Sequence, residues 1–403
     1  MRKAVKTARL HGRPEHEIVL CVARRELDIE QQARLRSLLT QVSDWDYLVA
    51  TASIHGLLPL LQKHLQSTEL DLVPVNIRSR IKHEAVANTQ TVLHLVGKQL
   101  KLYRLFKDRD IRVAVLKGSA LAQSAYGDIS LRQAGDIDVL ISRADFARAK
   151  TLLESLAYQM APSLTAAQLS SHLATNCEIQ FVRDDWFTVV DLHWALAPKN
   201  FVFKLDTDEL LSRLQPVTIA ATEIETLATE DLIVYLSMHG AKHLWRGLEW
   251  ISSLGELIRS AESIAWDTVV IRADKAHGTR MLALGLRLAE NVSRVEIPVE
   301  VLRAVDGDES SKQMAQNILL EIFDAPTAAA STETNLYNLK IMDRKRDALV
   351  SALRAIFIPT MTDWSTLNLP PALHSLYYAY RPLRLSRAYT AALWRRLASR
   401  GAA

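Results

Sequence analysis

The chain has 403 residues, a length that exceeds one typical core and predicts two or three domains. Hydrophobic residues make up 49% of it and glycine occupies only 13 positions, a composition typical of a soluble, mostly helical protein. The formal net charge of +4 is too weak to indicate nucleic-acid binding, so no nucleic-acid partner is expected.

Cys21 and Cys177 have neither CxxC spacing nor histidines at the spacing of a zinc site. We interpret both as buried free thiols in a reducing compartment. The apolar run IVLCVA near the N-terminus is too short for a signal peptide or a membrane span. These features predict a cytoplasmic protein without a transmembrane segment.

Hydrophobic periodicity divides the chain into three predicted parts. Apolar residues recur at helical spacing in residues 1–95 and again in 226–403, and a long amphipathic helix is predicted over about 77–108. Between these helical regions, residues 96–225 form the predicted core. Its β-like runs lie at 111–117, 135–141, 177–182 and 187–194, with helical segments at 119–127 and 143–158. The fold class is therefore α+β, a small mixed sheet flanked by helices.

Two aspartates stand one residue apart in the strand GDIDVLI. Since strand side chains alternate, Asp136, Asp138 and Leu140 share one face, while the apolar residues between them face the core. Two adjacent carboxylates repel each other, and a bound divalent cation relieves this repulsion. Without a cation, the acids would lie on a solvated face and be neutralised by Arg132 or Lys117.

Two neighbouring motifs favour a cation-binding site over a strand with one solvated face. Gly118 and Ser119 open a helix directly after a strand, where free backbone N–H groups and a hydroxyl accommodate a phosphate. In the strand TVVDLHW, Asp191 shares its face with His193 and adds a third acid. Three carboxylates in one cleft fit a two-metal phosphoryl- or nucleotidyl-transfer site.

These motifs resemble the nucleotidyltransferase superfamily typified by DNA polymerase β. More narrowly, LKGSALAQSAYGDISLRQAGDIDVLI followed by VDLHW, MHGAKHLWRGLEW and YRPLRL resembles a bacterial family of uncharacterised nucleotidyltransferases. The resemblance extends from WDYLVATASIHGLLPLL to LPPALHSLYYAYRPLRL. It implies a helix-flanked polymerase-β-type core, Mg²⁺ or Mn²⁺ as cofactor, and a nucleoside triphosphate, with ATP expected, as co-substrate.

Carried over to this sequence, the resemblance assigns Asp136, Asp138 and Asp191 as metal-binding catalytic acids. The nucleotide's phosphates would contact Gly118 and Ser119, with Lys117 or Arg132 stabilising the charge of the leaving pyrophosphate. Arg132 retains an alternative role, which is to balance the aspartates. The sequence departs from the family at Ser253, where an aspartate is common, and in a longer interval between the glycine turn and the D-x-D pair.

A helix beginning near residue 229 places His239 and His243 on the same stripe as two leucines. Two histidines four residues apart can bind zinc, but HGAKH lacks the glutamate of HExxH. We expect them to be core histidines. If this helix faces the carboxylates, His239, Lys242 and His243, like His193, become candidate contacts for phosphate or acceptor.

The C-terminal segment YYAYRPLRLSRAYTAALWRRLASR alternates aromatic residues with arginines. It fits a terminal helix with a solvated basic face, a peripheral membrane contact or a grip on an acidic partner.

The sequence therefore predicts a magnesium-dependent enzyme that transfers an NMP group from an NTP to a hydroxyl-type acceptor, releasing pyrophosphate. The acceptor is an unidentified small molecule, peptide or protein. The alternative is a catalytically silent nucleotide-binding or protein-interaction module on the same fold.

Overall fold

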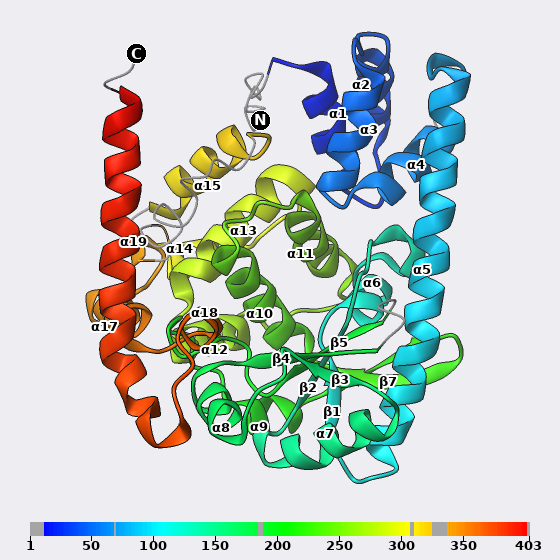
Figure 1. Cartoon of the computed structure of the whole chain (residues 1–403). Coiled ribbons are helices and arrows are strands. Elements are labelled where there is room, and N and C mark those ends of the chain that lie inside the picture. The colour runs from blue at the N-terminus through cyan, green and yellow to red at the C-terminus, as the bar shows by residue number, and fades with distance from the viewer. Residues whose placement is uncertain are drawn as a thin grey trace.

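The computed structural model of the chain describes residues 12–67, 70–183, 188–306, 310–324, 337 and 339–400. Helices dominate both ends of the chain, and strands are confined to its middle (Figure 1). The N-terminal helices are α1 Pro14–Cys21, α2 Ile29–Leu39, α3 Trp45–Ile54, α4 Leu58–Ser67 and α5 Val75–Lys107. The last of these, α5, is the long helix predicted at 77–108 and spans 33 residues.

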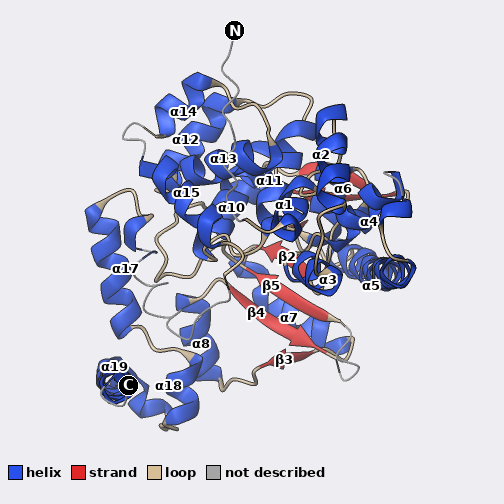
Figure 2. Cartoon of the chain, turned by 90° about the horizontal axis from the view of Figure 1, so that it is seen from above, coloured by secondary structure: helices blue, strands red, loops and turns tan. Residues whose placement is uncertain are grey.

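The strands from the middle of the chain form a five-stranded mixed sheet. Its strand order is β1-β2-β5-β4-β3, in which only β2 and β5 pair in parallel (Figure 2). The strands are β1 Val113–Val115, β2 Ile137–Ile141, β3 Gln159–Ala161, β4 Glu178–Val182 and β5 Val189–His193. A separate hairpin consists of β6 Gln215–Ile219 and β7 Thr222–Thr226.

Helices cover both faces of this sheet. On one face, Ile137, Val139 and Ile141 belong to a core cluster shared with α5 and with α7, Phe146–Ser155. On the other face, Ala114 and Leu140 join a second cluster that includes α6, Gly118–Tyr126. The face of β2 that carries Asp138 is therefore covered by protein.

The second cluster joins the two ends of the chain. It contains side chains from α1 to α5 together with side chains of the C-terminal helices, so both helical regions share one apolar interior. The remaining helices are α8 Ala166–Thr175, α9 Thr207–Leu211, α10 Thr229–Lys242, α11 Leu248–Ser260, α12 Trp266–Ala276, α13 Thr279–Ser293, α14 Val299–Val305, α15 Ser310–Glu321, α17 Lys345–Phe357, α18 Met361–Thr366 and α19 Tyr377–Arg400.

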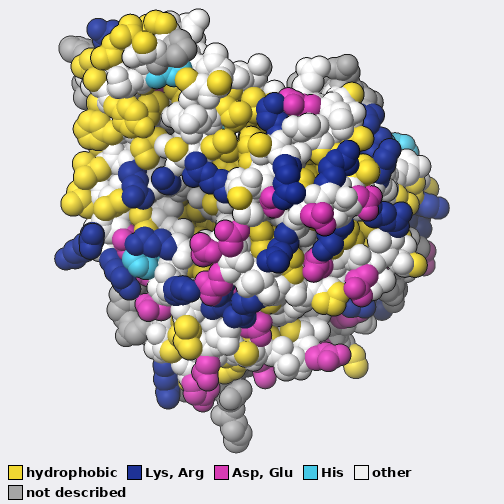
Figure 3. All heavy atoms as spheres, turned by 90° about the horizontal axis from the view of Figure 1, so that it is seen from below, with side chains coloured by type: hydrophobic (Ala, Val, Ile, Leu, Met, Phe, Trp, Pro, Cys, Tyr) yellow, Lys and Arg dark blue, Asp and Glu magenta, His cyan; other side chains and the backbone are white. Residues whose placement is uncertain are grey.

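The C-terminal end of the structure presents exposed apolar side chains. In α17 the polar Asp347 and Ser351 are buried, whereas Leu349 and Phe357 are exposed. Figure 3 shows hydrophobic side chains gathered at this end of the molecule, at the upper left of that view. In α19, Arg381 and Arg384 pair with buried Asp363 at 2.8 and 2.6 Å, so these two arginines belong to the fold and not to a solvated basic face.

The α+β class and the mixed sheet between helical flanks are confirmed. The segment predicted as one helix at 143–158 was too long: α7 ends at Ser155 and the chain continues into β3. Strand β3 and the β6–β7 hairpin were not predicted. Both cysteines are buried and free, as expected. Among the described helices, none combines the length and the hydropathy needed to cross a bilayer.

The first testable prediction concerns Gly240 in α10, whose lack of a side chain admits the Trp245 indole. A methyl group at this position would overlap the ring atoms of Trp245, which is fully buried. We expect Gly240→Ala to lower the free energy of unfolding by about 1–3 kcal/mol, measured by urea denaturation.

Gly97 is the matched control, because it lies within α5 and a methyl group there meets no atom within 4 Å. Gly97→Ala should raise stability by about 0.5–1 kcal/mol through helix propensity. Equal effects of the two substitutions would contradict this explanation.

Candidate active site

The predicted acids meet where β2 and β5 run side by side. Asp136 directly precedes β2, and within the parallel pair Asp138 lies opposite Asp191 while Leu140 lies opposite His193. The sheet register therefore brings together residues that are far apart in the sequence. Ligand atoms of Asp138, Asp191 and His193 all lie within 4.8 Å of one another, a spacing that could hold a metal ion.

Asp138 is the centre of this cluster. Its side chain is only 3% exposed, and its Oδ1 lies 3.0 Å from Lys117 Nζ and 3.0 Å from His193 Nε2. Burial alone would raise the pKa of Asp138, but the positive charges of Lys117 and His193 hold it below its ordinary value. The same interactions work in reverse on Lys117: burial lowers its pKa, but Tyr235 and Asp138 raise it overall.

His193 connects Asp138 to a fourth acid. Its Nδ1 lies 3.0 Å from Glu178 Oε2 on β4, the residue opposite it in the antiparallel register. Burial opposes the charged imidazole, yet the two carboxylates raise the pKa of His193 to about 9. Against the effect of burial, His193 in turn lowers the pKa of Glu178 to about 2. With both ring nitrogens facing carboxylates, His193 acts as a buried cation and offers no free lone pair to a metal.

Asp136 and Asp191 lack this compensation. Within the described chain, neither makes an ion pair, and Asp191 Oδ1 is buried without a hydrogen-bond partner. Burial and the charges of Asp138 and Asp136 raise the pKa of Asp191 to about 6. Burial and Asp138 also raise the pKa of Asp136. The unbalanced negative charge of the cluster therefore resides on these two carboxylates.

The turn from β1 into α6 brings Lys117 to the cluster. Gly118, the first residue of α6, has φ +56°, a left-handed conformation that glycine adopts without strain. The next side chain, Ser119, is buried, and its Oγ accepts a hydrogen bond from Gln99 Nε2 at 2.8 Å. Ser119 therefore keeps its own hydroxyl proton for another acceptor.

Arg132 has a partner that the sequence did not suggest. Its Nη2 lies 2.5 Å from Glu249 Oε1 on α11, and both side chains are largely buried. No ion pair joins Arg132 to Asp136 or Asp138 among the described residues, although its charge lowers the pKa of Asp136 against the effects of burial and of Asp138. Arg132 is thus held beside the cluster by α11.

The candidate residues His239, Lys242 and His243 lie at the end of α10, where the charge of Lys117 acts on both histidines. The rings of His239 and His243 are 4.7 Å apart, and both contact Trp250, with centroids at 5.7 and 5.4 Å. His239 is half-buried and His243, which follows α10, is exposed, so the expectation of core histidines is wrong. Partial burial and the charges of Lys242 and Lys117 lower the pKa of His243, and burial with the charge of Lys117 lowers that of His239. Both imidazoles are therefore neutral near pH 7. Lys242 is the residue that carries positive charge beside them.

Sequence reasoning missed Glu178 and Glu249. Glu178 alternates with Gln180 along β4, a polar face that was visible in the sequence, but its role appears only when β4 is placed beside β5. No local sequence pattern marked Glu249 as a partner of Arg132. Ser253, named above as a departure from the resemblance, is buried with Ser252 against Tyr126, whose hydroxyl is 3.2 and 2.9 Å from the two serine oxygens.

Comparison with known proteins agrees with this geometry. No curated protein matches the chain closely enough to add a more specific activity. A family model described as uncharacterised nucleotidyltransferase matches residues 41–293, which include every side chain of the cluster. Since this match covers more than half of the chain, the protein belongs to the uncharacterised nucleotidyltransferase family.

Proposed function

We propose that this nucleotidyltransferase moves an NMP group from a magnesium-bound NTP to an acceptor hydroxyl and releases pyrophosphate. The observation that supports this most is the pair of carboxylates without ion pairs, Asp136 and Asp191, next to the neutralised Asp138. Both side chains are partly buried, and Asp191 Oδ1 is buried without a hydrogen-bond partner, which is costly. Their retention fits a cation that arrives with the substrate.

The residues present fit a divalent metal. Asp191 Oδ1 is an oxygen donor with no hydrogen-bond partner, and Asp138 contacts Lys117 and His193 through Oδ1. Asp136, Asp138 and Asp191 are therefore the ligands we assign, with His193 orienting Asp138. When bound, Mg²⁺ or Mn²⁺ would neutralise phosphate charge and lower the pKa of a coordinated hydroxyl.

The phosphates would lie at the turn that opens α6. Lys117 supplies positive charge there, Gly118 lets the chain approach closely, and the Ser119 hydroxyl can donate a hydrogen bond. Arg132, fixed by Glu249, would stabilise charge on the leaving pyrophosphate.

In the transfer step, the acceptor oxygen attacks the α-phosphorus, and the bond to the bridging oxygen of pyrophosphate breaks. The hydroxyl proton needs a base, and Asp191, whose Oδ1 has no hydrogen-bond partner, is the carboxylate we assign to receive it. His239, Lys242 and His243 would form the wall nearest to the acceptor.

We expect the acceptor to be a small molecule, a peptide or a protein, and ATP to be the donor. The rival is a nucleotide-binding module without turnover. The compensation of Asp138 by Lys117 and His193 favours that rival, because it satisfies part of the site without a metal. An assay that separates binding from pyrophosphate release distinguishes the two.

The second prediction concerns the acids. Asp136→Asn and Asp191→Asn preserve shape but remove a metal ligand, so each should reduce transfer of label from α-labelled ATP by about 10²-fold or more. The measurement uses an extract of the source organism as the supply of acceptors, with pyrophosphate release followed in parallel.

Asp110→Asn is the matched control, because Asp110 is exposed and its side chain lies outside the cluster. It should retain the native rate. Equal labelling by the native protein and both site variants would refute the proposed chemistry, and ATP binding without pyrophosphate release would favour the silent module.

The third prediction concerns pH. Because Asp191 has a raised pKa of about 6, it is mainly ionised at pH 7 and mainly protonated at pH 5. Metal binding needs the ionised form, so Mn²⁺ affinity should fall by up to about tenfold per pH unit below pH 6. Isothermal titration of the full chain measures this slope.

Asp191→Asn should bind Mn²⁺ more weakly at pH 7 and show a shallower slope between pH 7 and 5. The remaining slope would report Asp136, whose pKa is also raised by burial and Asp138. An unchanged slope in Asp191→Asn would show that this carboxylate is not a ligand.

A further inference from the structure

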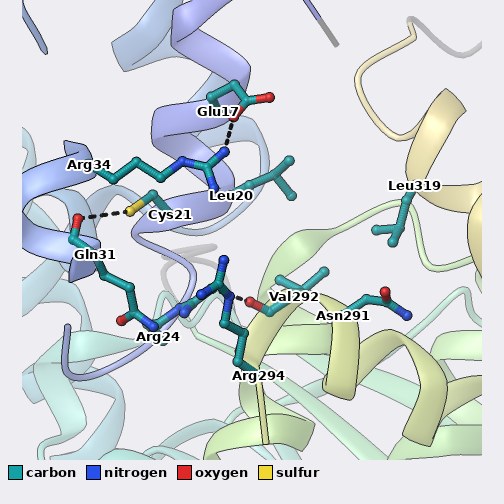
Figure 4. Close-up of a pocket in the computed structure, with 10 residues that line it drawn as sticks. All are labelled: Glu17, Leu20, Cys21, Arg24, Gln31, Arg34, Asn291, Val292, Arg294 and Leu319. Atoms are coloured by element: carbon teal, nitrogen blue, oxygen red, sulfur yellow. Dashed lines mark hydrogen bonds and ion pairs between the residues drawn. The ribbon is translucent and has the colours of Figure 1, made fainter. Parts of the chain in front are cut away.

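A second charged site lies away from the sheet, between the two ends of the chain. A cavity of about 90 Å³ separates α1 and α2 from α13 and α15 (Figure 4). Its lining residues are Glu17, Leu20, Cys21, Arg24, Gln31, Arg34, Asn291, Val292, Arg294 and Leu319. Three of these are arginines and one is an acid.

Arg24 is the most unusual of these residues. It is only 5% exposed, and its Nη2 donates to the backbone oxygen of Val292. Its Nε and Nη1 are buried and have no hydrogen-bond partner in the described part of the chain. A buried guanidinium with two unused donors is destabilising unless an anion accepts from them.

The neighbouring residues do not supply that anion. Glu17, the acid of the lining, is ion-paired with Arg34, and Glu256, whose charge reaches Arg24, is ion-paired with Arg259. Burial raises the pKa of Cys21, so its thiol stays neutral at pH 7 and donates weakly to the Gln31 oxygen. Exposed Arg294 makes no ion pair within the described ranges and adds further positive charge.

We propose that this cavity is a binding site for a phosphate-type oxyanion, held by Arg24 and Arg294 with Arg34 at its edge. Guanidinium groups match such anions well, because their planar N–H pairs donate to two oxygens at once. The inference is independent of the nucleotide site proposed above, since none of the cavity residues belongs to the carboxylate cluster.

The volume of the cavity limits the size of the ligand that can bind there. Pockets that enclose drug-sized molecules have volumes of roughly 300–1,000 Å³, well above this one. The cavity therefore admits one phosphate-sized group and not a whole nucleotide. That group can be inorganic phosphate, or one end of pyrophosphate or of a nucleotide whose remainder extends into solvent past exposed Arg294.

The test measures the melting temperature of the full chain with EDTA present, at constant ionic strength. Chloride is compared with phosphate, pyrophosphate and ADP in separate arms, which distinguish the possible sources of the group. We expect phosphate to raise the melting temperature above its value in chloride, because it binds only the folded chain.

Two substitutions test the roles of the two arginines. Arg294→Gln changes an exposed side chain and should weaken phosphate binding by about tenfold or more, reducing the shift. Arg24→Met should abolish the shift. Arg303→Gln on α14, also exposed, is the matched control and should keep the full native shift.

A purely structural role for Arg24 predicts a different result. In that case Arg24→Met would lower the melting temperature by the same amount in chloride and in phosphate, and the phosphate shift would remain. A native protein that responds equally to phosphate and chloride, or a shift unchanged in Arg294→Gln and Arg24→Met, would overturn the proposal.

Discussion

The buried carboxylate of Asp138 is the constraint on which the rest of the site depends. A single ionised group at this depth is stable only if cations reach it. Lys117 comes from the turn after β1 and His193 from β5, so the neutralising charges arrive from both strands that flank β2. Charge balance and strand order are therefore linked. Any arrangement of the sheet that separated β2 from β5 would remove His193 and leave Lys117 as the cation paired with Asp138.

This arrangement also fixes where negative charge remains. Asp138 and Glu178 share the cations, whereas Asp136 and Asp191 receive none at ion-pair distance among the described residues. Their raised pKa values are the electrostatic consequence of burial beside ionised neighbours. One carboxylate is thus fixed by ion pairs with the protein, and the two without such pairs are the ones that the proposed metal site requires.

The sequence predicted the placement of these side chains where the information was local. Strand alternation placed Asp136 with Asp138 and Asp191 with His193, and the small-residue turn placed Lys117 at a helix start. It failed where the partner came from a distant segment, as with Glu178 opposite His193 and Glu249 beside Arg132. The β6–β7 hairpin was not predicted, and one of its strands contains Pro216, which disfavours strand structure. Tertiary contacts, and not residue type, decide these pairings.

The two proposed sites follow from one physical rule applied with opposite sign. In the sheet, the carboxylates of Asp136, Asp138, Asp191 and Glu178 outnumber the cations paired with them, so the site favours a cation. In the cavity between α1 and α13, arginines outnumber carboxylates, so the site favours an anion. The net charge of +4 indicates neither site. It adds together solvated charges, which cost little free energy, and buried charges, which cost much. Local charge imbalance, and not the net charge, is therefore the basis of both proposals.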